Sequence, residues 1–397
     1  MTTDGTGLLD LAARRLGGGV VAASDEWFAD KENLLAPGPP TFDPQAFGHK
    51  GKIMDGWETR RRREPGHDWA LVRLGAPGVV HSVVIDTSHF TGNYPESASV
   101  EGCAFDGYPS PSELCADDVE WLELVPRTLL RGDAENRVCV HCDRRITHVR
   151  LRIYPDGGVA RLRVFGDVVP DPRELSGAPL DLAAQENGGL AIDCSDRFYS
   201  SPHNLNASGL PANMGEGWET RRRRGEGNDW VVLRLAAAGT VRQAIVDTTY
   251  FLGNAPAAFA LSGCDVAESD LDDPGAWHVL LPRMRLQPDT RHRFAVAAER
   301  PVTHVRIDVF PDGGLARLRL FGELTDSGRS RLALRWFDAV SAQQAARALQ
   351  KAGVSPEQAL RIAASRPVED RAGLDRLLSD GDLAADAAAA VRRLLGR

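Results

Sequence analysis

Lysine is scarce in this chain of 397 residues, in which arginine supplies almost all of the positive charge. Only four of the 47 basic residues are lysines: Lys31, Lys50, Lys52 and Lys351. This bias, with abundant alanine and glycine, is typical of codon composition, so a run of arginines carries less functional weight than usual. The formal net charge is −8 at pH 7, whereas a surface that binds nucleic acid is basic. We therefore expect no nucleic-acid partner.

Long hydrophobic runs are also missing. No segment approaches the roughly 20 apolar residues of a transmembrane helix, and the N-terminus lacks the basic region, apolar core and cleavage site of a signal peptide. The six cysteines do not follow the spacing of a disulfide framework. We therefore expect a cytoplasmic protein in a reducing compartment, with no membrane partner.

The usual motifs of metal-dependent and nucleophilic hydrolases are absent. There is no His-x-x-x-His or HExxH pattern and no Gly-x-Ser-x-Gly. Cys139 and Cys142 have a Cys-x-x-Cys spacing, but no second ligand pair accompanies them. Buried or edge thiols are a better interpretation of this pair than a zinc site. We expect no metal and no other cofactor.

What the sequence does contain is an internal duplication. The octapeptide Gly-Trp-Glu-Thr-Arg-Arg-Arg-Arg occupies residues 56–63 and recurs, identical, at 217–224. Each copy is followed by Asp-Trp, then Asp-Thr, then Phe-x-Gly-Asn, and residues 147–166 and 303–322 share 14 of 20 positions. Solenoid modules repeat every roughly 20–50 residues, so these longer units are whole domains.

The duplication predicts a domain organisation. We expect an N-terminal segment over residues 1–19, a first repeat over 20–170, a linker rich in proline, glycine and acid over 171–188, a second repeat over 189–325 and a different, helical region over 326–397.

Within each repeat, short apolar runs with a period of two end at turn residues. Ala70, Val72 and Leu74 share one face of such a run, and the Pro-Asp-Gly-Gly at 155–158 separates two more, as in a hairpin or another tight strand connection. No long helical pattern lies between the runs, which argues against parallel βαβ units. The prediction is an all-β fold with two tandem antiparallel β-sandwiches.

The C-terminal region has the signals of helices. Capping boxes of the Ser-x-x-Gln type start at Ser341 and Ser355, and Gly353 ends the first of these helices. Alanine-rich stretches at 367–378 and 382–395 predict two more helices. We expect a small C-terminal helical extension that serves in packing or in oligomerisation, since it carries no chemical constellation.

The repeated charged block is the main candidate for chemistry. In extended structure Arg60 and Arg62 would share one face with Glu58. Guanidinium groups bind carboxylate or urea-type oxygens through two parallel hydrogen bonds. The alternative interpretation of the arginines is a solvated, charged strand edge. For Glu58 and its counterpart Glu219, the two interpretations are an acid/base group and a structural ion pair.

Other repeated polar residues have two interpretations each. Asp68 either caps a turn or orients the arginines. Asp86 ends a buried run, where an isolated carboxylate is costly, so we expect it to join the arginines in a network. Asn93 follows a glycine and is either a left-handed turn residue or a site residue.

The two repeats differ around the shared block. His67 and His89 of the first repeat become Asn228 and Tyr250 in the second. Of the ten histidines only His148 and His304 correspond, and a packed histidine is the simplest explanation of that pair. The differences predict either one site that depends on repeat 1 or two unequal sites.

These blocks, in this order, resemble the allantoicase family, whose members consist of two homologous repeats. The resemblance covers about residues 20–325, with matching segments at 55–60, 68–69, 86–93 and 155–163 in repeat 1 and at 217–221, 229–230, 247–254 and 311–319 in repeat 2. It implies that each repeat is a jelly-roll β-sandwich similar to galactose-binding domains, in agreement with the strand pattern.

The resemblance also implies an activity. Allantoicases are hydrolases acting on C–N bonds in linear amidines: they convert allantoate to ureidoglycolate and urea during purine breakdown through allantoin. On this resemblance Glu58 and Glu219 are the catalytic candidates for proton transfer, and arginines bind the substrate carboxylate. The substrate-binding candidates are Arg60, Arg62, Arg221, Arg223, Asp68, Asp229, Asp86, Asp247, Asn93, Asn254 and His89.

Repeat 2 departs from the family pattern. Glu216 replaces the aspartate before Gly-Trp, and an alanine-rich stretch follows Asn254, which puts a complete second site in doubt. The alternative functions are a non-enzymatic tandem carbohydrate-binding protein and a scaffold that has lost its activity. In each case we expect a homo-oligomer.

Overall fold

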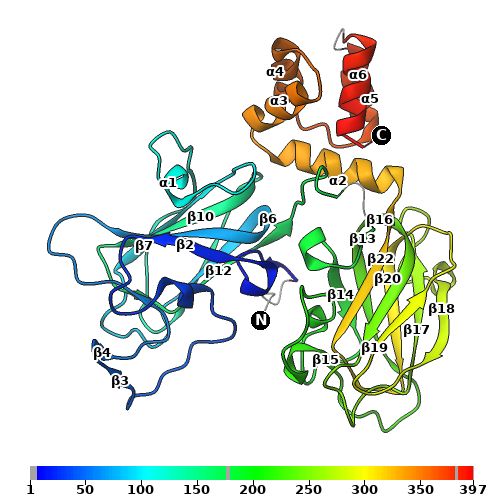
Figure 1. Ribbon diagram of the computed structural model, residues 1–397, viewed down its shortest axis with the longest axis horizontal. Coiled ribbons are helices and arrows are strands. Elements are labelled where there is room, and N and C mark those ends of the chain that lie inside the picture. Colours follow the sequence, from blue (N-terminus) through cyan, green and yellow to red (C-terminus); the bar gives the residue numbers. More distant parts are fainter. Residues whose placement is uncertain (1–6, 176–178, 381–382, 397) are drawn as a thin grey trace. The chain divides into compact units, whose positions relative to one another are not determined.

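Two compact units, Met1–Val168 and Val169–Arg397, make up the chain (Figure 1). The computed structural model describes residues 7–175, 179–380 and 383–396. Each unit contains one large antiparallel sheet folded into a sandwich, and the second unit also carries the C-terminal helices. The predicted all-β fold of two tandem sandwiches with a small helical extension is confirmed.

The first sandwich is a single eight-stranded sheet. Its strands are β1 (Leu9–Asp10), β2 (Gly19–Ala23), β6 (Asp68–Asp86), β7 (Ser97–Cys103), β8 (Leu122–Leu129), β9 (Glu135–Cys139), β10 (Arg145–Tyr154) and β12 (Arg161–Val168). Two short ladders lie outside it: β3 (Phe47–Gly48) with β4 (Gly51–Lys52), and β5 (Trp57–Glu58) with β11 (Gly158–Val159). The sheet therefore also includes residues before position 20.

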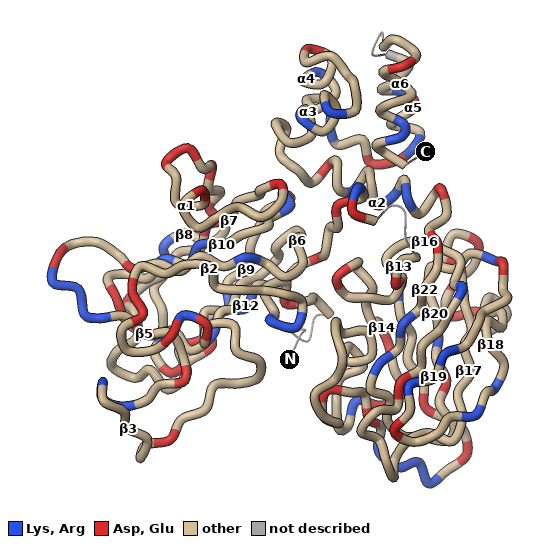
Figure 2. The backbone as a smooth tube through the Cα atoms, viewed as in Figure 1, with Lys and Arg blue, Asp and Glu red and all other residues tan. Residues whose placement is uncertain are grey.

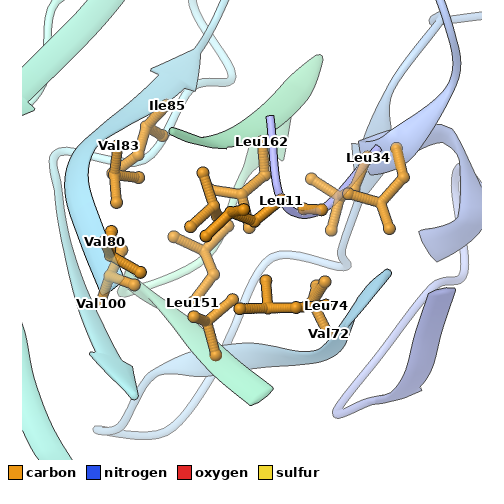
Figure 3. Close-up of a cluster of buried hydrophobic side chains, with 14 of the residues drawn as sticks. Leu11, Leu34, Val72, Leu74, Val80, Val83, Ile85, Val100, Leu151 and Leu162 are labelled. Atoms are coloured by element: carbon orange, nitrogen blue, oxygen red, sulfur yellow. The ribbon is translucent and has the colours of Figure 1, made fainter. Parts of the chain in front are cut away.

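The long strand β6 belongs to both layers of this sandwich. Residues 68–73 pair with β2 and β10, whereas residues 82–86 pair with β9 and β12. Inward side chains of both parts meet in one core, which contains Val72 and Leu74 of the first part, Val83 and Ile85 of the second, and Leu151 and Leu162 of the paired strands (Figure 3). The predicted alternation of apolar residues along the first half of β6 is confirmed.

The second sandwich repeats this topology. Its strands are β13 (Leu180–Asp181), β14 (Leu190–Cys194), β16 (Asp229–Asp247), β17 (Ala258–Cys264), β18 (His278–Arg285), β19 (Arg291–Ala295), β20 (Val302–Phe310) and β22 (Arg317–Leu324), with the short pair β15 (Trp218–Glu219) and β21 (Gly314–Leu315). β16 takes the place of β6 and pairs with β14, β20, β19 and β22.

Short helices occur in the loops. They are η1 (Arg14–Leu16), η2 (Lys31–Leu35), α1 (Pro111–Leu114), η3 (Gln185–Asn187), η4 (Pro202–Asn204), η5 (Met214–Glu216) and η6 (Pro274–Ala276). α1 begins with a complete capping box at Ser110.

The Pro-Asp-Gly-Gly motif is a tight connection and not a hairpin turn. β10 and β12 flank it, yet each of them pairs with β6 and they do not pair with each other. The segment that contains the motif therefore moves the chain from one layer of the sandwich to the other between Tyr154 and Arg161, and the same change occurs between β20 and β22.

The helical extension has one helix more than the sequence pattern predicts. Within the described residues it comprises α2 (Asp326–Ala339), α3 (Ala342–Lys351), α4 (Pro356–Ala364), α5 (Arg371–Asp380) and α6 (Ala385–Leu394). α2 packs against β16 and β22, and its Leu332 belongs to the core of the second sandwich. The predicted capping box is complete at Ser341, and Ser355 caps the next helix by accepting from the backbone N–H of Gln358.

The corresponding histidines His148 and His304 are packed residues, as predicted. Both are buried, and Nδ1 of each lies within 3.0 Å of the hydroxyl of the preceding threonine. Burial lowers the pKa of each to about 4, so both are neutral at physiological pH and serve the core.

A buried carboxyl at the start of the first sheet generates a stability prediction. Asp10 accepts hydrogen bonds from the backbone N–H groups of Ala12 and Val164 at 3.2 and 3.0 Å, and burial raises its pKa from 3.8 to about 6. The folded state therefore binds this proton more tightly than the unfolded chain, so the contribution is present below pH 4 and is lost as the pH rises through about 6.

We expect Asp10→Asn, which keeps an acceptor but cannot ionise, to remove that pH dependence. Its stability relative to the native chain should rise by up to about 3 kcal/mol between pH 4 and pH 7, as measured by urea unfolding. Asp117→Asn, at an exposed position, is the control. An equal pH profile for the native and Asp10→Asn proteins would contradict the prediction.

Candidate active site

The short strand β5 turns the repeated glutamate away from the core. Trp57 is fully buried, and its indole N–H donates to the carbonyl of Asp25 at 2.8 Å. Because successive side chains of a strand point to opposite sides, the neighbouring Glu58 faces outward. Its backbone pairs with Gly158 of β11, which fixes the carboxyl beside the Pro-Asp-Gly-Gly turn.

Two glycines let the loop after β6 approach that turn. A Cβ on Gly158 would lie 1.9 Å from the ring of Phe90, and a Cβ on Gly157 would lie 2.8 Å from the carbonyl oxygen of Asn93. The backbone N–H of Gly158 donates to that same oxygen at 2.8 Å. This spacing needs glycine at both positions, which explains why the motif recurs in both repeats.

The approach brings an amide onto the glutamate. Asn93 Nδ2 donates to Glu58 Oε1 at 2.7 Å, and Asn254 Nδ2 donates to Glu219 Oε1 at 2.6 Å. Burial raises the pKa of Glu58, and the hydrogen bond from Asn93 opposes that effect without cancelling it. The glutamate therefore keeps its proton to a higher pH than an exposed glutamate.

The Glu58–Asn93 pair lines a pocket of about 250 Å³ in the first unit. His89 lies in the same wall, where its ring stacks on Phe42 with centroids 5.5 Å apart. The lining combines acidic, basic, amide and apolar groups: Phe28, Phe42, Lys50, Lys52, Met54, Glu58, His89, Thr91 and Asn93. Such a mixture suits a small polar ligand that carries both charge and hydrogen-bonding groups.

The first repeated arginine lies outside this lining. β5 ends at Glu58, and the arginines follow in extended coil. Arg60 NH2 lies 2.6 Å from Asp25 Oδ2, and its side chain is 64% exposed; Arg221 pairs with Asp196 in the same way, at 2.9 Å. Both arginines are thus already neutralised by a carboxylate.

The third arginine of each run is held in the same manner. Arg62 NH1 contacts Asp68 Oδ1 at 2.9 Å, and Arg223 NH2 contacts Asp229 Oδ1 at 2.5 Å. The backbone N–H of Arg62 also donates to Asp156 of the Pro-Asp-Gly-Gly turn at 2.8 Å. These contacts attach the arginine run to the sandwich and to the turn.

The aspartates at the end of β6 and β16 have local partners. Asp86 Oδ1 accepts from the N–H of Ser88 at 2.8 Å, and Asp247 Oδ1 accepts from the N–H and hydroxyl of Thr249 at 2.9 and 2.5 Å. Among the described residues, Asp86 and Asp247 do not join the arginines of the repeated run, although the charge of Asp86 acts on Arg163 of β12. These carboxylates shape the loop that carries the asparagine.

The left-handed residue of that loop is not the asparagine. Positive φ occurs at His89 (69°) and Tyr250 (71°), whereas Asn93 and Asn254 are not among the residues with positive φ. The turn interpretation of the two asparagines is therefore wrong. His89 is held there by the bond from its backbone N–H to Asp133 at 2.7 Å.

Of the pocket lining only Glu58, His89 and Asn93 were named from the sequence, and the charged residues that were missed include Lys50, Lys52 and, beside Arg60, Asp25. Asp25 has an equivalent in Asp196, and a repeated Ser-Asp at 24–25 and 195–196 would have revealed both. Lys50 and Lys52 line the pocket. The sequence feature that could have identified them is that lysine is rare in this chain. The aspartate that precedes Gly-Trp in repeat 1, Asp55, forms an ion pair with Arg161 at 2.8 Å. In repeat 2 Glu216 takes the place of Asp55 and lies beside Arg317.

Two further properties concern cofactors and membranes. Within residues 7–175, 179–380 and 383–396 no three His, Cys, Asp or Glu side chains are grouped as metal ligands would be. In the same parts of the chain, no helix combines the length and apolar character needed to cross a bilayer.

Comparison with known proteins gives consistent matches. The family model described as "Allantoicase repeat" matches residues 9–169 and 180–325. A protein of Nocardia farcinica named "Probable allantoicase" is 55% identical and covers 80% of this chain and 95% of its own length. One of Streptomyces coelicolor with the same name is 52% identical and covers 82% and 88%. The crystal structure of allantoicase from Saccharomyces cerevisiae is 34% identical, with a TM-score of 0.66, and covers 79% of this chain and 93% of that one.

The glycine turn generates a prediction. Gly158→Ala would place a methyl group inside the Phe90 ring, so the loop must move and the Glu58–Asn93 bond must lengthen. We expect about 1–3 kcal/mol of destabilisation, measured by urea unfolding. Gly92→Ala, in the same loop, meets nothing within 4 Å and is the matched control. Equal stability of the two variants would refute the explanation of the turn.

Proposed function

This chain belongs to the allantoicase family, and we propose that it hydrolyses allantoate to ureidoglycolate and urea at the pocket around Glu58. The observation that carries the proposal is the placement of the family's repeated glutamate: Glu58 lies in a pocket, is hydrogen-bonded to Asn93, and has a pKa raised by burial. The relatives support a hydrolase acting on a small molecule.

The reaction requires two proton transfers, one to the departing nitrogen and one from the attacking water. Allantoate carries a carboxylate and two ureido groups on a single carbon. The bond between that carbon and one ureido nitrogen breaks, the oxygen of water bonds to the carbon, and one proton of the water ends on the nitrogen of urea. A single acid/base group can therefore serve both halves of the reaction.

Glu58 has the properties of that group. Because burial raises its pKa, it can hold a proton and donate it to the departing nitrogen, which makes urea a neutral leaving group. The resulting carboxylate then accepts a proton from the water that adds to the carbon. Asn93 keeps Oε1 in place through its hydrogen bond, and Oε2 is left for proton transfer.

The remaining candidates divide into two groups. His89, in the pocket wall, contacts the substrate. Arg60 and Arg62, which are paired with Asp25 and Asp68, position the segment that carries Glu58. Positioning is also the role of Asp86 and of the repeat 2 equivalents Arg221, Arg223, Asp229 and Asp247.

Repeat 2 retains the dyad but not its surroundings. Glu219 and Asn254 form the same hydrogen bond, while Tyr250 replaces His89. We propose unequal sites, with the main activity in repeat 1. We also propose that the protein acts in the cytoplasm as a homo-oligomer, which light scattering coupled to gel filtration tests.

The first experiment replaces each glutamate separately. We expect Glu58→Gln to lower kcat for urea release from allantoate by about 10²–10⁴-fold, the usual contribution of an acid/base group, and Glu219→Gln to have a smaller effect. Glu64→Gln, at an exposed carboxyl near the end of the arginine run, is the control. If neither glutamate variant changes urea release, the assignment is wrong.

The pH profile gives an independent test. A group that must donate a proton loses activity when it ionises, so kcat should fall as the pH rises through the raised pKa of Glu58. The residual activity of Glu58→Gln should lack this descending limb. A native profile with no descending limb, or one that persists unchanged in the variant, argues against Glu58 as the acid.

A further inference from the structure

Two of the four lysines line the same pocket as Glu58. We propose that Lys50 and Lys52 form the subsite for the substrate carboxylate and thereby select a ureide that carries this group. The inference rests on the proposed function and names residues that determine its specificity. Both lysines belong to the β3–β4 hairpin region, which projects from the first sandwich (Figure 1).

The choice of amino acid is the first argument. Only four of the 47 basic residues are lysines, so the composition favours arginine wherever a positive charge alone is needed. Two lysines at alternate positions, both lining one pocket, depart from that bias together. A compact ammonium on a flexible stem offers point-charge contact with an anion, where a guanidinium would fill more of a small pocket.

The second argument is that these two ammonium groups have no carboxylate partner. Lys31, nearby in sequence, pairs with Glu26 and Glu32 at 3.1 Å each. Within the described residues, neither Lys50 nor Lys52 forms an ion pair. Their nitrogens lie over aromatic rings instead: Lys50 is 4.9 Å from the centroid of Trp27, and Lys52 is 4.9 Å from that of Phe42 and 5.7 Å from that of Phe47.

The neighbouring arginines do not supply this charge. Arg60 is neutralised by Asp25 and Arg62 by Asp68, and neither arginine lines the pocket. The uncompensated positive charge in the lining therefore comes from the lysines. Glu58 lines the same pocket, and its protonated form adds no negative charge, so an anionic ligand is favoured.

The third argument is that the lysines occupy an insertion. Asn33 donates to the carbonyl of Gly56, 23 residues later, and Asn204 makes the equivalent bond to Gly217, 13 residues later. The additional residues of repeat 1 form the β3–β4 hairpin, where Figure 2 shows basic residues. Repeat 2 has no lysine at all, so the carboxylate subsite belongs to the first repeat alone.

The test compares allantoate with bis(ureido)methane, which has the same two ureido groups and no carboxylate. Urea release by the full-length native protein should favour allantoate by about 100-fold in kcat/KM, since a hydrogen bond to a charged group contributes about 1.5–3 kcal/mol. Lys50→Gln and Lys52→Gln should each raise KM for allantoate about tenfold with little change in kcat. Values for bis(ureido)methane should stay the same.

Matched variants separate a subsite from a structural role. The Lys50→Arg and Lys52→Arg changes keep the charge but enlarge its head group, so the preference for allantoate should fall between that of the native protein and that of the glutamine variants. Lys351→Gln, in the helical extension, should behave as the native protein does. The Arg60→Gln variant tests whether Arg60 binds the substrate carboxylate instead. If Arg60→Gln loses the preference for allantoate and the lysine variants keep it, the inference is overturned.

The same measurements separate a failure of the lysine subsite from a failure of the proposed function. If the native protein releases no urea from allantoate, the proposed function fails. If the native protein is active and the double variant Lys50→Gln/Lys52→Gln keeps both its KM and its preference for allantoate, the function stands and the lysine subsite is wrong.

Discussion

The close approach between the Phe90 loop and the glycine turn sets the geometry on which the candidate site depends. With a hydrogen atom in place of Cβ at Gly158, the aromatic ring lies against the backbone of the turn. The same contact places Asn93 beside Glu58. The position of the candidate acid is thus determined by backbone packing between two segments far apart in the sequence.

Much of the fold follows from local pattern, and the exceptions have physical reasons. A period of two along the first half of β6 was sufficient to predict a half-buried strand. The α2 helix was missed because Gly328, Ser327 and Ser330 give its first half a low helix propensity. Its Trp336 and Phe337 are nevertheless buried, so tertiary packing decides its structure.

The candidate site was only partly predictable. The duplicated Glu58 and Asn93 could be named from sequence, but not their mutual hydrogen bond, because it joins residues 35 positions apart. The arginines showed the opposite problem. Their conspicuous repetition suggested ligand binding, while their actual partners, such as Asp25, lie in a less obvious repeat. The sequence alone does not reveal whether an arginine is paired with a carboxylate or is free to bind a ligand.

The long strand of each sandwich, β6 or β16, determines how that sandwich unfolds. Since one continuous strand contributes hydrogen bonds to both layers, neither layer can separate or melt alone without breaking the ladder of the other. Each sandwich is therefore a single cooperative unit of unfolding. The pocket lies next to the end of that strand, so the sandwich holds most of its wall in place. The β3–β4 hairpin lies outside the sheet and is the part of the pocket that can differ between the two repeats.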